Sequence, residues 1–403
     1  MTGDPRRPRR VLVVDADPAT AGRLTGPLAA AGYRLQVESV SREPAGGRTV
    51  PFDVLIAQAG SLEPEDFRLL ARSNADAYRI VSLRVDEAAT IDRWMAAGAD
   101  DVLFLPLDPA SVLFRLAAAE RIVRLRRDLE SKSETLLEAN ARLEQANSRL
   151  REELRAAARV QQALLPAPGF AAPGVQLAWQ LRPCDELAGD LLNCVRVDEK
   201  HLGFYVLDVC GHGVSSALQS VQVSRLMSPM MAESSLLKER LDQPPWYRLV
   251  EPQRVAERLN EMFQVGAGGG KYFTLVYGLM QLESGLVRLV SAGHPGPVRV
   301  PRGGSPRSVP LRGHPVGLFD EADFASHAFV LEPGERIWFY SDGIVDAMND
   351  EEQTFGLEGL ERRLDAQRDS PLSDAVAGVM EAVERWTGAS GPGDDCTLLV
   401  LER

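Results

Sequence analysis

Short apolar runs alternate with helix-like stretches over the first 120 residues of the chain. The runs VLVVDAD, FDVLIAQAG and YRIVSLRV are rich in β-branched residues and end in polar or glycine-containing flanks, which is typical of buried strands. A helix-like segment, PATAGRLTGPLAAAG, follows the first run. Strands that alternate with helices predict a parallel sheet with helical crossovers, so we expect an α/β, doubly wound domain over residues 9–120.

A heptad pattern follows this first domain. Apolar residues recur at every seventh position, namely Ile122, Leu129, Leu136, Leu143 and Leu150. Taken as d positions, they leave mostly polar a positions, which are Arg126, Ser133, Asn140 and Asn147. Leucine at d with asparagine at a favours a parallel two-stranded coiled coil, so we expect a helical linker over residues 121–165 and a homodimer through residues 121–160. The alternative is a single amphipathic helix that packs on a neighbouring domain.

Short β-rich runs dominate the chain after the proline-containing segment PAPGFAAPG. Examples are HLGFYVLDV, YFTLVYGLMQL and ERIWFYSDG. Helix-like stretches interrupt these runs at about 213–238, 252–264, 356–368 and 371–387. This mixture predicts an α+β domain with antiparallel sheets over residues 166–403.

Composition excludes several classes of protein. A formal charge of −12 over 403 residues argues against general nucleic-acid binding, which needs a basic face. No apolar run approaches the length that spans a bilayer, and no apolar segment follows the basic start MTGDPRRPRR as it would in a signal peptide. The four cysteines form no CxxC pair, which favours reduced thiols. We therefore expect a cytoplasmic protein with neither a nucleic-acid nor a membrane partner.

Aspartates stand at the ends of several β-rich runs in the last domain. They are Asp190 in ELAGD, Asp208 in FYVLDV, Asp342 in WFYSDG and the pair Asp394 and Asp395 in GPGDDC. Aspartate is depleted in strands, and a single one beside glycine is most simply a turn residue. Several in this arrangement indicate a site for Mg²⁺ or Mn²⁺, because hard divalent cations take carboxylate oxygens and glycine lets the backbone approach.

Two other motifs suggest different chemistry. Cys210 and His212 lie on a glycine turn, but a catalytic cysteine and its histidine generally come from separate segments with a third group that orients the base. Cys210 is therefore expected to pack, and His212 either approaches a phosphate or stabilises the turn. The stretch VGAGGGKYF lacks the P-loop pattern, because Lys271 is followed by Tyr272 and no glycine stands five residues before Gly270. We expect a loop beside the active site there.

The flanks of the aspartates carry a family resemblance. The motifs AGD, LDVCGHGVSSAL, FTLVYGLM, SAGHPGP, GLFDEADF, YSDGIVDAMND and GDDCTLLVLE occur in order. Together they resemble the metal-dependent protein serine/threonine phosphatases (the PPM or type 2C family), and most of all the bacterial branch that controls sigma-factor partner switching. The likeness covers residues 160–402, and ARVQQALLP resembles the helix that leads into this branch. It implies stacked antiparallel β-sheets flanked by helices, with metals in a cleft at one end.

This resemblance implies a set of catalytic and metal-binding residues. Asp208 would bridge two Mn²⁺ or Mg²⁺ ions, and Asp342 and Asp394 would hold one of them. The Val209 carbonyl and Asp190 would serve the other ion. Further candidates for contacts to the phosphate or to the ligands are His212, Asn193 and Asp395. A water acidified by both ions would attack phosphorus in line, so no cysteine or serine nucleophile is required.

The resemblance also implies a substrate and an alternative. Ala188 and Asn193 stand where the family often has glycine and aspartate, but neither is a principal ligand, so we expect activity. The implied reaction is hydrolysis of phosphoserine or phosphothreonine on a signalling protein, a STAS-type anti-sigma antagonist. The alternative is a catalytically weak pseudophosphatase adaptor that acts by protein binding. The presence of all four metal-site aspartates favours the enzyme.

The first domain resembles a two-component receiver whose chemistry has been removed. The acidic pair is reduced to Asp15 with Asp17 nearby, and Gln58 replaces the phosphoacceptor aspartate. Arg84 and Leu105 occupy the positions of the usual Thr/Ser and Lys. A neutral amide cannot form an aspartyl phosphate, so we expect a pseudo-receiver that is not phosphorylated and regulates the phosphatase in another way. An approach of Arg84 to Gln58, mimicking a locked state, is one hypothesis.

Overall fold

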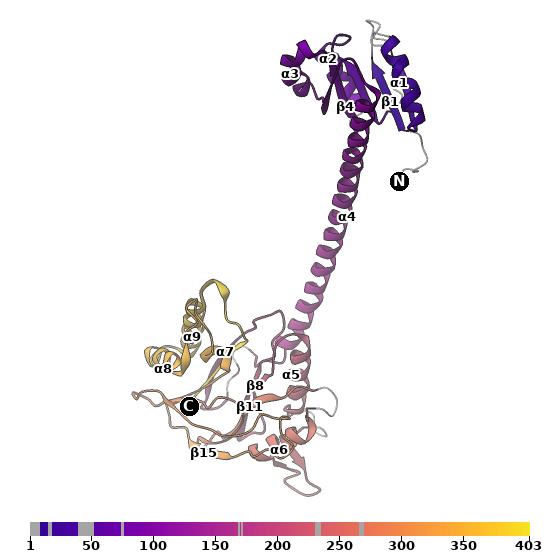
Figure 1. The fold of residues 1–403 in the computed structure, drawn as a ribbon. Helices are drawn as coiled ribbons and strands as arrows, with labels where there is room; N and C mark the ends of the chain where they lie inside the picture. The colour runs from indigo at the N-terminus through magenta and orange to yellow at the C-terminus, as the bar shows by residue number, and fades with distance from the viewer. Residues whose placement is uncertain are drawn as a thin grey trace. The chain divides into compact units, whose positions relative to one another are not determined.

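The computed structural model comprises two compact units, residues 1–144 and 145–403, which are described separately (Figure 1). The residues it describes are 9–14, 18–38, 52–73, 76–167, 170, 172–229, 235–265 and 270–403. None of the described helices is both long and apolar enough to cross a membrane.

The N-terminal unit contains the predicted parallel, doubly wound sheet. Its five strands lie in the order β2 (Tyr33–Glu38), β1 (Arg9–Val14), β3 (Val54–Gln58), β4 (Tyr78–Leu83) and β5 (Asp101–Phe104). Both faces are covered, which explains the continuous apolar runs of these strands. Its shorter helical elements are α1 (Pro18–Ala30), α2 (Pro64–Ser73), η1 (Val85–Thr90) and α3 (Ile91–Ala96). On one face Phe67 of α2 and Trp94 of α3 meet edge to face, with ring centroids 5.7 Å apart.

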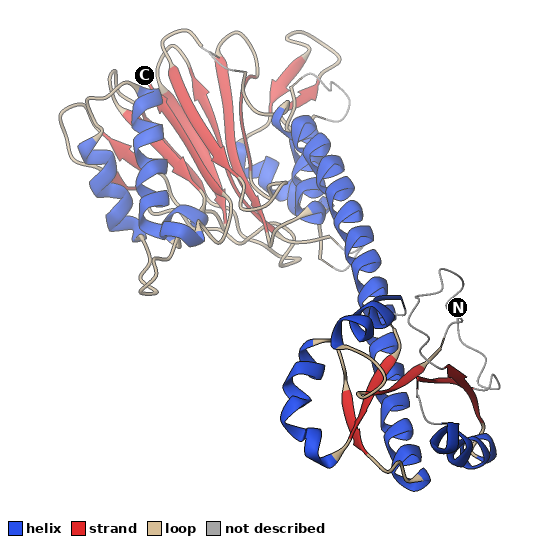
Figure 2. Ribbon diagram, turned by 90° about the horizontal axis from the view of Figure 1, so that it is seen from above, coloured by secondary structure: helices blue, strands red, loops and turns tan. Residues whose placement is uncertain are grey.

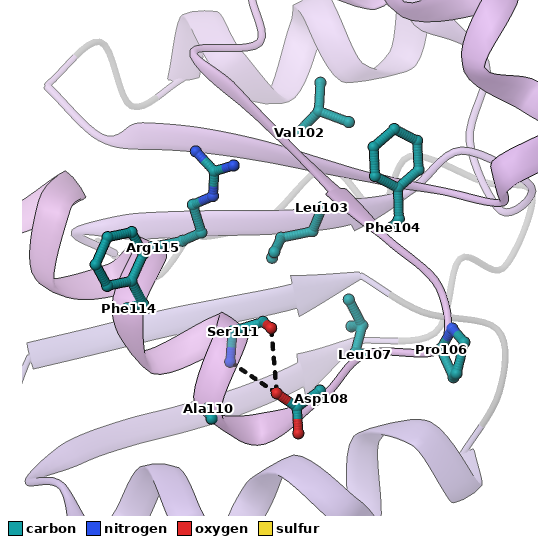
Figure 3. A pocket seen from close by; sticks show the side chains of 10 residues that line it. All are labelled: Val102, Leu103, Phe104, Pro106, Leu107, Asp108, Ala110, Ser111, Phe114 and Arg115. Atoms are coloured by element: carbon teal, nitrogen blue, oxygen red, sulfur yellow. Dashed lines mark hydrogen bonds between the residues drawn. The ribbon is translucent and has the colours of Figure 1, made fainter.

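The long helix α4 (Pro109–Gln162) begins inside this unit. Asp108 accepts hydrogen bonds from the backbone N–H and the hydroxyl of Ser111, which lower the pKa of its carboxyl and cap the helix. Val112 and Leu116 then bury themselves in the core beside β1 and β3. A hollow of about 500 Å³ lies between β5 and the start of α4, lined in part by the exposed side chains Phe104 and Phe114 (Figure 3).

Two five-stranded antiparallel sheets form the C-terminal unit. The first has the order β15 (Ser326–Val330), β12 (Leu286–Ala292), β11 (Phe273–Gln281), β8 (His201–Val209), β7 (Leu191–Arg196). The second has the order β14 (Arg307–Ser308), β13 (Val298–Val300), β16 (Arg336–Tyr340), β17 (Cys396–Glu402), β6 (Gln176–Arg182). A small hairpin pairs β9 (Lys238–Arg240) with β10 (Tyr247–Leu249). The predicted antiparallel sheets are thus confirmed.

Helices cover the outer faces of these sheets (Figure 2). Against the first sheet lie α5 (Val214–Leu226) and α6 (Pro252–Met262), and against the second lie α8 (Gly356–Ala366) and α9 (Leu372–Thr387). Strand β8 shows why its run is apolar throughout. Phe204 and Val206 point into the core between the sheets, whereas Tyr205 and Leu207 alternate toward α5 and α6.

Helix α5 is shorter than the sequence predicts. The expectation was a helix over about 213–238, but α5 ends at Leu226, and Lys238 already belongs to β9. Pro229 follows the last turn and has no backbone N–H with which to continue the helix. Residues 230–234 lie outside the described part of the chain.

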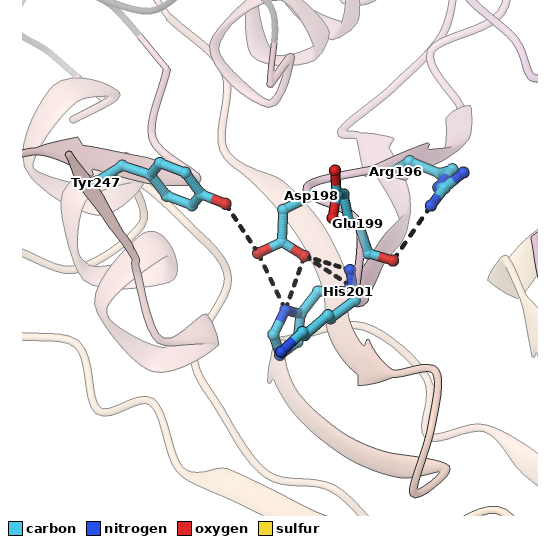
Figure 4. A network of polar contacts seen from close by, with 6 residues as sticks. Arg196, Asp198, Glu199, His201 and Tyr247 are labelled. Atoms are coloured by element: carbon cyan, nitrogen blue, oxygen red, sulfur yellow. Dashed lines mark hydrogen bonds and ion pairs between the residues drawn. The ribbon is translucent and has the colours of Figure 1, made fainter. Parts of the chain in front are cut away.

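The turn between β7 and β8 is fixed by Asp198 (Figure 4). Its carboxylate accepts the backbone N–H groups of Lys200 and His201, each at 2.8 Å, and lies 2.9 Å from Nδ1 of His201. The hydroxyl of Tyr247 in β10 donates to the same carboxylate at 3.4 Å. These contacts attach the β9–β10 hairpin at the end of β8 that is opposite Asp208.

Candidate metal centre

The predicted aspartates meet at one end of the two sheets. Asp208 is the penultimate residue of β8, and Asp190 directly precedes β7, which pairs with β8 in antiparallel register. Asp342 follows β16 and opens the short helix α7 (Asp342–Val345), and Asp394 lies just before β17. Because β16 and β17 are also antiparallel neighbours, the end of one and the start of the other share an edge. The fold therefore gathers side chains that are far apart in the sequence.

Burial and mutual repulsion disfavour the charged forms of these carboxyls. Asp190 is 1% exposed, and burial, followed by the charge of Asp208, raises its pKa well above the usual range. Burial raises the pKa of Asp208 to about 7, with further contributions from Asp342 and Asp394. For Asp342, burial and then Asp394 and Asp346 raise the pKa. Each carboxyl thus lies within electrostatic range of the next.

Asp395 differs from its neighbour Asp394. Asp395 is 3% exposed, and its carboxylate accepts the backbone N–H groups of Cys184 at 2.8 Å, Gly189 at 2.6 Å and Asp190 at 3.3 Å. Asp394 is exposed at the rim. The inner carboxylate therefore fixes the loop that carries Asp190, while the outer one remains accessible.

A close backbone contact shapes the same place. A Cβ on Gly189 would lie 3.0 Å from the carbonyl oxygen of Val209 and 3.2 Å from Cβ of Ser216. A glycine at this position therefore lets the AGD loop approach the end of β8 without displacing Val209 or Ser216. Next to it, the hydroxyl of Thr397 donates to Oδ2 of Asp190 at 2.5 Å and orients that carboxyl.

The donor set fits hard divalent cations. Carboxylates and a backbone carbonyl are the oxygen ligands that Mg²⁺ and Mn²⁺ prefer. Within the described residues, the potential ligand atoms that all lie within 4.8 Å of one another belong to Cys184, Asp394 and Asp395. Mg²⁺ and Mn²⁺ prefer oxygen to sulfur, and in the metal-free protein burial and these two carboxylates raise the pKa of the Cys184 thiol to about 12. The carboxylates are the groups suited to a cation.

The remaining candidates lie nearby with other partners. His212 is exposed, and its Nδ1 lies 3.6 Å from Oδ2 of Asp185. The Asn193 amide donates to the carbonyl of Leu164 at 2.7 Å and accepts the N–H of Cys194 at 2.7 Å. The hydrogen bonds of Asn193 thus fix the segment after α4.

Gln161 is a residue that sequence reasoning missed. It is 7% exposed on the last turn of α4. Its amide donates to the carbonyl of Ala188 at 2.7 Å and accepts the N–H of the same residue at 3.2 Å, and it also donates to Ser220 of α5 at 3.2 Å. The motif VQQALLP contained it, but nothing in the motif distinguishes Gln161 from Gln162.

The structure describes three of the five degenerate receiver positions, namely Gln58, Arg84 and Leu105. Asp15 and Asp17 lie outside the described residues. Gln58 ends β3 half-buried, and Leu105 packs against the core of the N-terminal unit. The hypothesis that Arg84 approaches Gln58 is not supported, because the Arg84 guanidinium pairs with Asp86 at 3.3 Å and with Glu87 at 3.0 Å. The guanidinium is therefore held by the two acids of the following turn.

The raised pKa of Asp208 predicts how pH affects the stability of metal-free protein. A carboxyl whose folded-state pKa is raised contributes stability that is present below its unfolded pKa and lost as pH rises through the folded pKa. Stability is therefore expected to fall between about pH 4 and pH 7, the two pKa values involved. Urea unfolding of chelated protein at several pH values measures this. Saturating Mn²⁺ should remove most of the fall at neutral pH, and an equal fall with Mn²⁺ would contradict the prediction.

Sequence comparisons with known proteins identify a family and two relatives of this chain. The family model for Stage II sporulation protein E (SpoIIE) matches residues 198–403. The chain is 27% identical over 255 residues to phosphoserine phosphatase RsbP of Bacillus subtilis, covering 62% of this chain and 58% of that protein. It is 22% identical over 270 residues to protein IcfG of Synechocystis, covering 63% and 42% respectively. The chain thus spans less than two thirds of either relative.

A solved structure shows the same fold. The SiaA-PP2C domain of Pseudomonas aeruginosa superposes with a TM-score of 0.53 at 17% sequence identity. The match covers 64% of this chain and 98% of that domain. The C-terminal unit therefore has the fold of PP2C-type phosphatases, two antiparallel sheets flanked by helices.

Proposed function

This chain belongs to the Stage II sporulation protein E (SpoIIE) family, and we propose that its residues 166–403 are a metal-dependent protein serine/threonine phosphatase. The observation that carries the proposal is the group of acidic side chains at one end of the sheets, in which burial and the charges of neighbouring carboxylates raise the pKa values of Asp190, Asp208 and Asp342. Such mutual repulsion is unfavourable in the absence of cations and is relieved by binding them.

We assign the ligands as follows. Asp208 would contribute to binding both of two Mn²⁺ or Mg²⁺ ions, Asp342 and Asp394 would hold one of them, and the Val209 carbonyl and Asp190 would hold the other. When bound, the ions supply an acidified water and neutralise charge on the phosphoryl oxygens. The protein's own part is to hold the ligand oxygens of these aspartates in place. Thr397 orients Asp190, and Asp395 fixes the loop on which Asp190 lies.

The substrate class follows from the relatives. RsbP is named a phosphoserine phosphatase, and the sequence motifs resemble the partner-switching branch, so we propose a phosphorylated STAS-type protein. Purified chain should hydrolyse p-nitrophenyl phosphate and a phospho-STAS protein only with Mn²⁺ or Mg²⁺. Binding without turnover of any phospho-STAS protein would favour the pseudophosphatase adaptor instead.

We propose that the N-terminal unit regulates the phosphatase without being phosphorylated itself. Gln58 supplies no carboxylate at the end of β3. Incubation with acetyl phosphate and mass spectrometry should detect no phosphoryl group on residues 9–120.

The four cysteines are free thiols, which suits the reducing cytoplasm where we place the protein.

We further propose a homodimer through residues 121–160. The apolar heptad positions of α4 are exposed in the single chain, at 69% for Leu129, 70% for Leu136 and 67% for Leu143. Burial of such a stripe against a second copy would stabilise the helix pair.

The proposed dimer predicts that glutamates at the apolar heptad positions weaken the association of the two copies. L136E combined with L143E is expected to weaken association by on the order of 100-fold or more, because each loses about 1.5–3 kcal/mol of burial in both copies. Sedimentation equilibrium measures it. The matched control is A141E combined with S148E, two positions on the outer side of the heptad, which should remain at twice the mass of one chain. Equal masses for the two double variants would contradict the proposed dimer.

A further inference from the structure

Lys271 lies at the rim of the candidate metal centre, next to the turn that follows Asp208. Strands β8 and β11 pair Asp208 with Thr274, and the N–H of Cys210 donates to the carbonyl of Tyr272 at 3.1 Å. This pairing brings Lys271 beside Gly211. Its ammonium lies 3.4 Å from the position that a Cβ on Gly211 would occupy.

The lysine is held on both its backbone and its side chain by α5. Gln219 accepts the N–H of Lys271 at 2.9 Å and donates to its carbonyl. The ammonium donates to the hydroxyl of Ser216 at 2.8 Å, and Ser216 is fully buried. Ordering a lysine side chain costs conformational entropy, and these contacts organise the ammonium in advance of any ligand.

Ser216 connects the lysine to the carboxylate site. Cβ of Ser216 and the carbonyl oxygen of Val209 both line the space beside Gly189, at 3.2 Å and 3.0 Å from where its Cβ would be. Gly189 directly precedes Asp190. The ammonium is therefore hydrogen-bonded to a side chain that packs against the backbone of the AGD loop.

Across the described part of the chain, no carboxylate lies within 4.0 Å of Nζ of Lys271, so the ammonium has no ion pair with these residues. An ammonium has three donors, and the hydrogen bond to Ser216 uses one of them. An ordered cation with free donors beside a site for phosphoesters is suited to bind an anionic oxygen, and lysine is a common phosphate ligand.

We propose that Lys271 binds a non-bridging phosphoryl oxygen of the phosphoserine or phosphothreonine substrate and of the released inorganic phosphate. This rests on the proposed phosphatase function. The chain has three other lysines, Lys132, Lys200 and Lys238. Lys200 is exposed in the turn between β7 and β8, at the opposite end of β8 from Asp208, and so provides a matched control.

The test uses inorganic phosphate as the probe on the full-length, Mn²⁺-loaded protein. K271M is expected to weaken phosphate binding, measured both by calorimetry and as product inhibition, by about 10- to 100-fold, the value of a charge-assisted hydrogen bond. K271R should restore much of it, and K200M should match the wild type. Thermal melts of each variant establish that the fold is intact.

Two outcomes would overturn the proposal. The first is unchanged phosphate affinity in K271M. The second is an equal loss in K200M, since the effect on phosphate binding would then not depend on the position of the lysine beside the metal centre. Failure of the phosphatase assignment itself looks different, because the wild-type protein would then show no Mn²⁺-dependent hydrolysis of p-nitrophenyl phosphate.

Discussion

D208N is expected to lower Mn²⁺-dependent hydrolysis by at least about 10³-fold, which corresponds to about 4 kcal/mol of transition-state stabilisation. Asp208 is the central carboxyl of the group, since the charges of Asp342 and Asp394 both act on it and Asp190 lies within hydrogen-bonding reach. An asparagine keeps the size of the side chain but removes the negative charge that we assign to both cations. Steady-state assays with p-nitrophenyl phosphate and with a phosphoprotein measure the loss.

The same variant should gain stability when no metal is present. Replacing a carboxyl whose pKa is raised to about 7 removes an unfavourable charge at neutral pH, on the order of 1–4 kcal/mol. Chelated D208N should therefore unfold at higher urea than chelated wild type at pH 8, and Mn²⁺ should shift its midpoint much less. An inactive variant that is also less stable would indicate misfolding, and retained activity would contradict the assignment.

Asp395 and Asp394 are adjacent, and their substitutions should both lower activity but differ in their effect on the stability of the fold. D395A leaves the buried N–H groups of Cys184, Gly189 and Asp190 without their acceptor. Each unsatisfied group costs about 1–3 kcal/mol, so the melting temperature is expected to fall by about 6 °C or more. Activity falls with it, because the loop that carries Asp190 loses its support.

D394A is the matched control. Asp394 is exposed, so the melting temperature of metal-free protein should change little, while Mn²⁺-dependent activity falls by about 100-fold or more if it is a ligand. D395N tests the geometry further, since its amide nitrogen would face backbone donors, and it should be nearly as unstable as D395A. Equal melting temperatures for D394A and D395A would contradict the division of roles.

Local pattern was sufficient to predict most of the architecture. The β-rich run HLGFYVLDV predicted the strand β8, and α6 and α9 lie within two residues of their predicted ranges. The position of the aspartates at strand ends was also predictable, because antiparallel neighbours bring such ends to a common edge. The helix expected over 213–238 was too long, since helical periodicity does not reveal where a proline-containing turn begins.

The roles of particular residues depended on contacts that no local pattern encodes. Of the two adjacent acids, the inner one is selected by a hydrogen bond to Gly189, 206 residues away in the sequence. Gln161 and Gln162 are chemically identical, and only the packing of α4 against Ala188 and Ser220 separates them. Likewise, Arg84 pairs with Asp86 and Glu87 of the following turn rather than with Gln58.

The chain that leaves α4 is attached to the phosphatase fold by two neutral amides. Gln161 bonds to the backbone of Ala188, and Asn193 bonds to the carbonyl of Leu164. Salt screens interactions between charges, but it has little effect on hydrogen bonds of this kind. Ionic strength and pH will therefore act on the carboxylate group while leaving this attachment in place, so a titration with salt separates the electrostatics of the site from the anchoring of its entry helix.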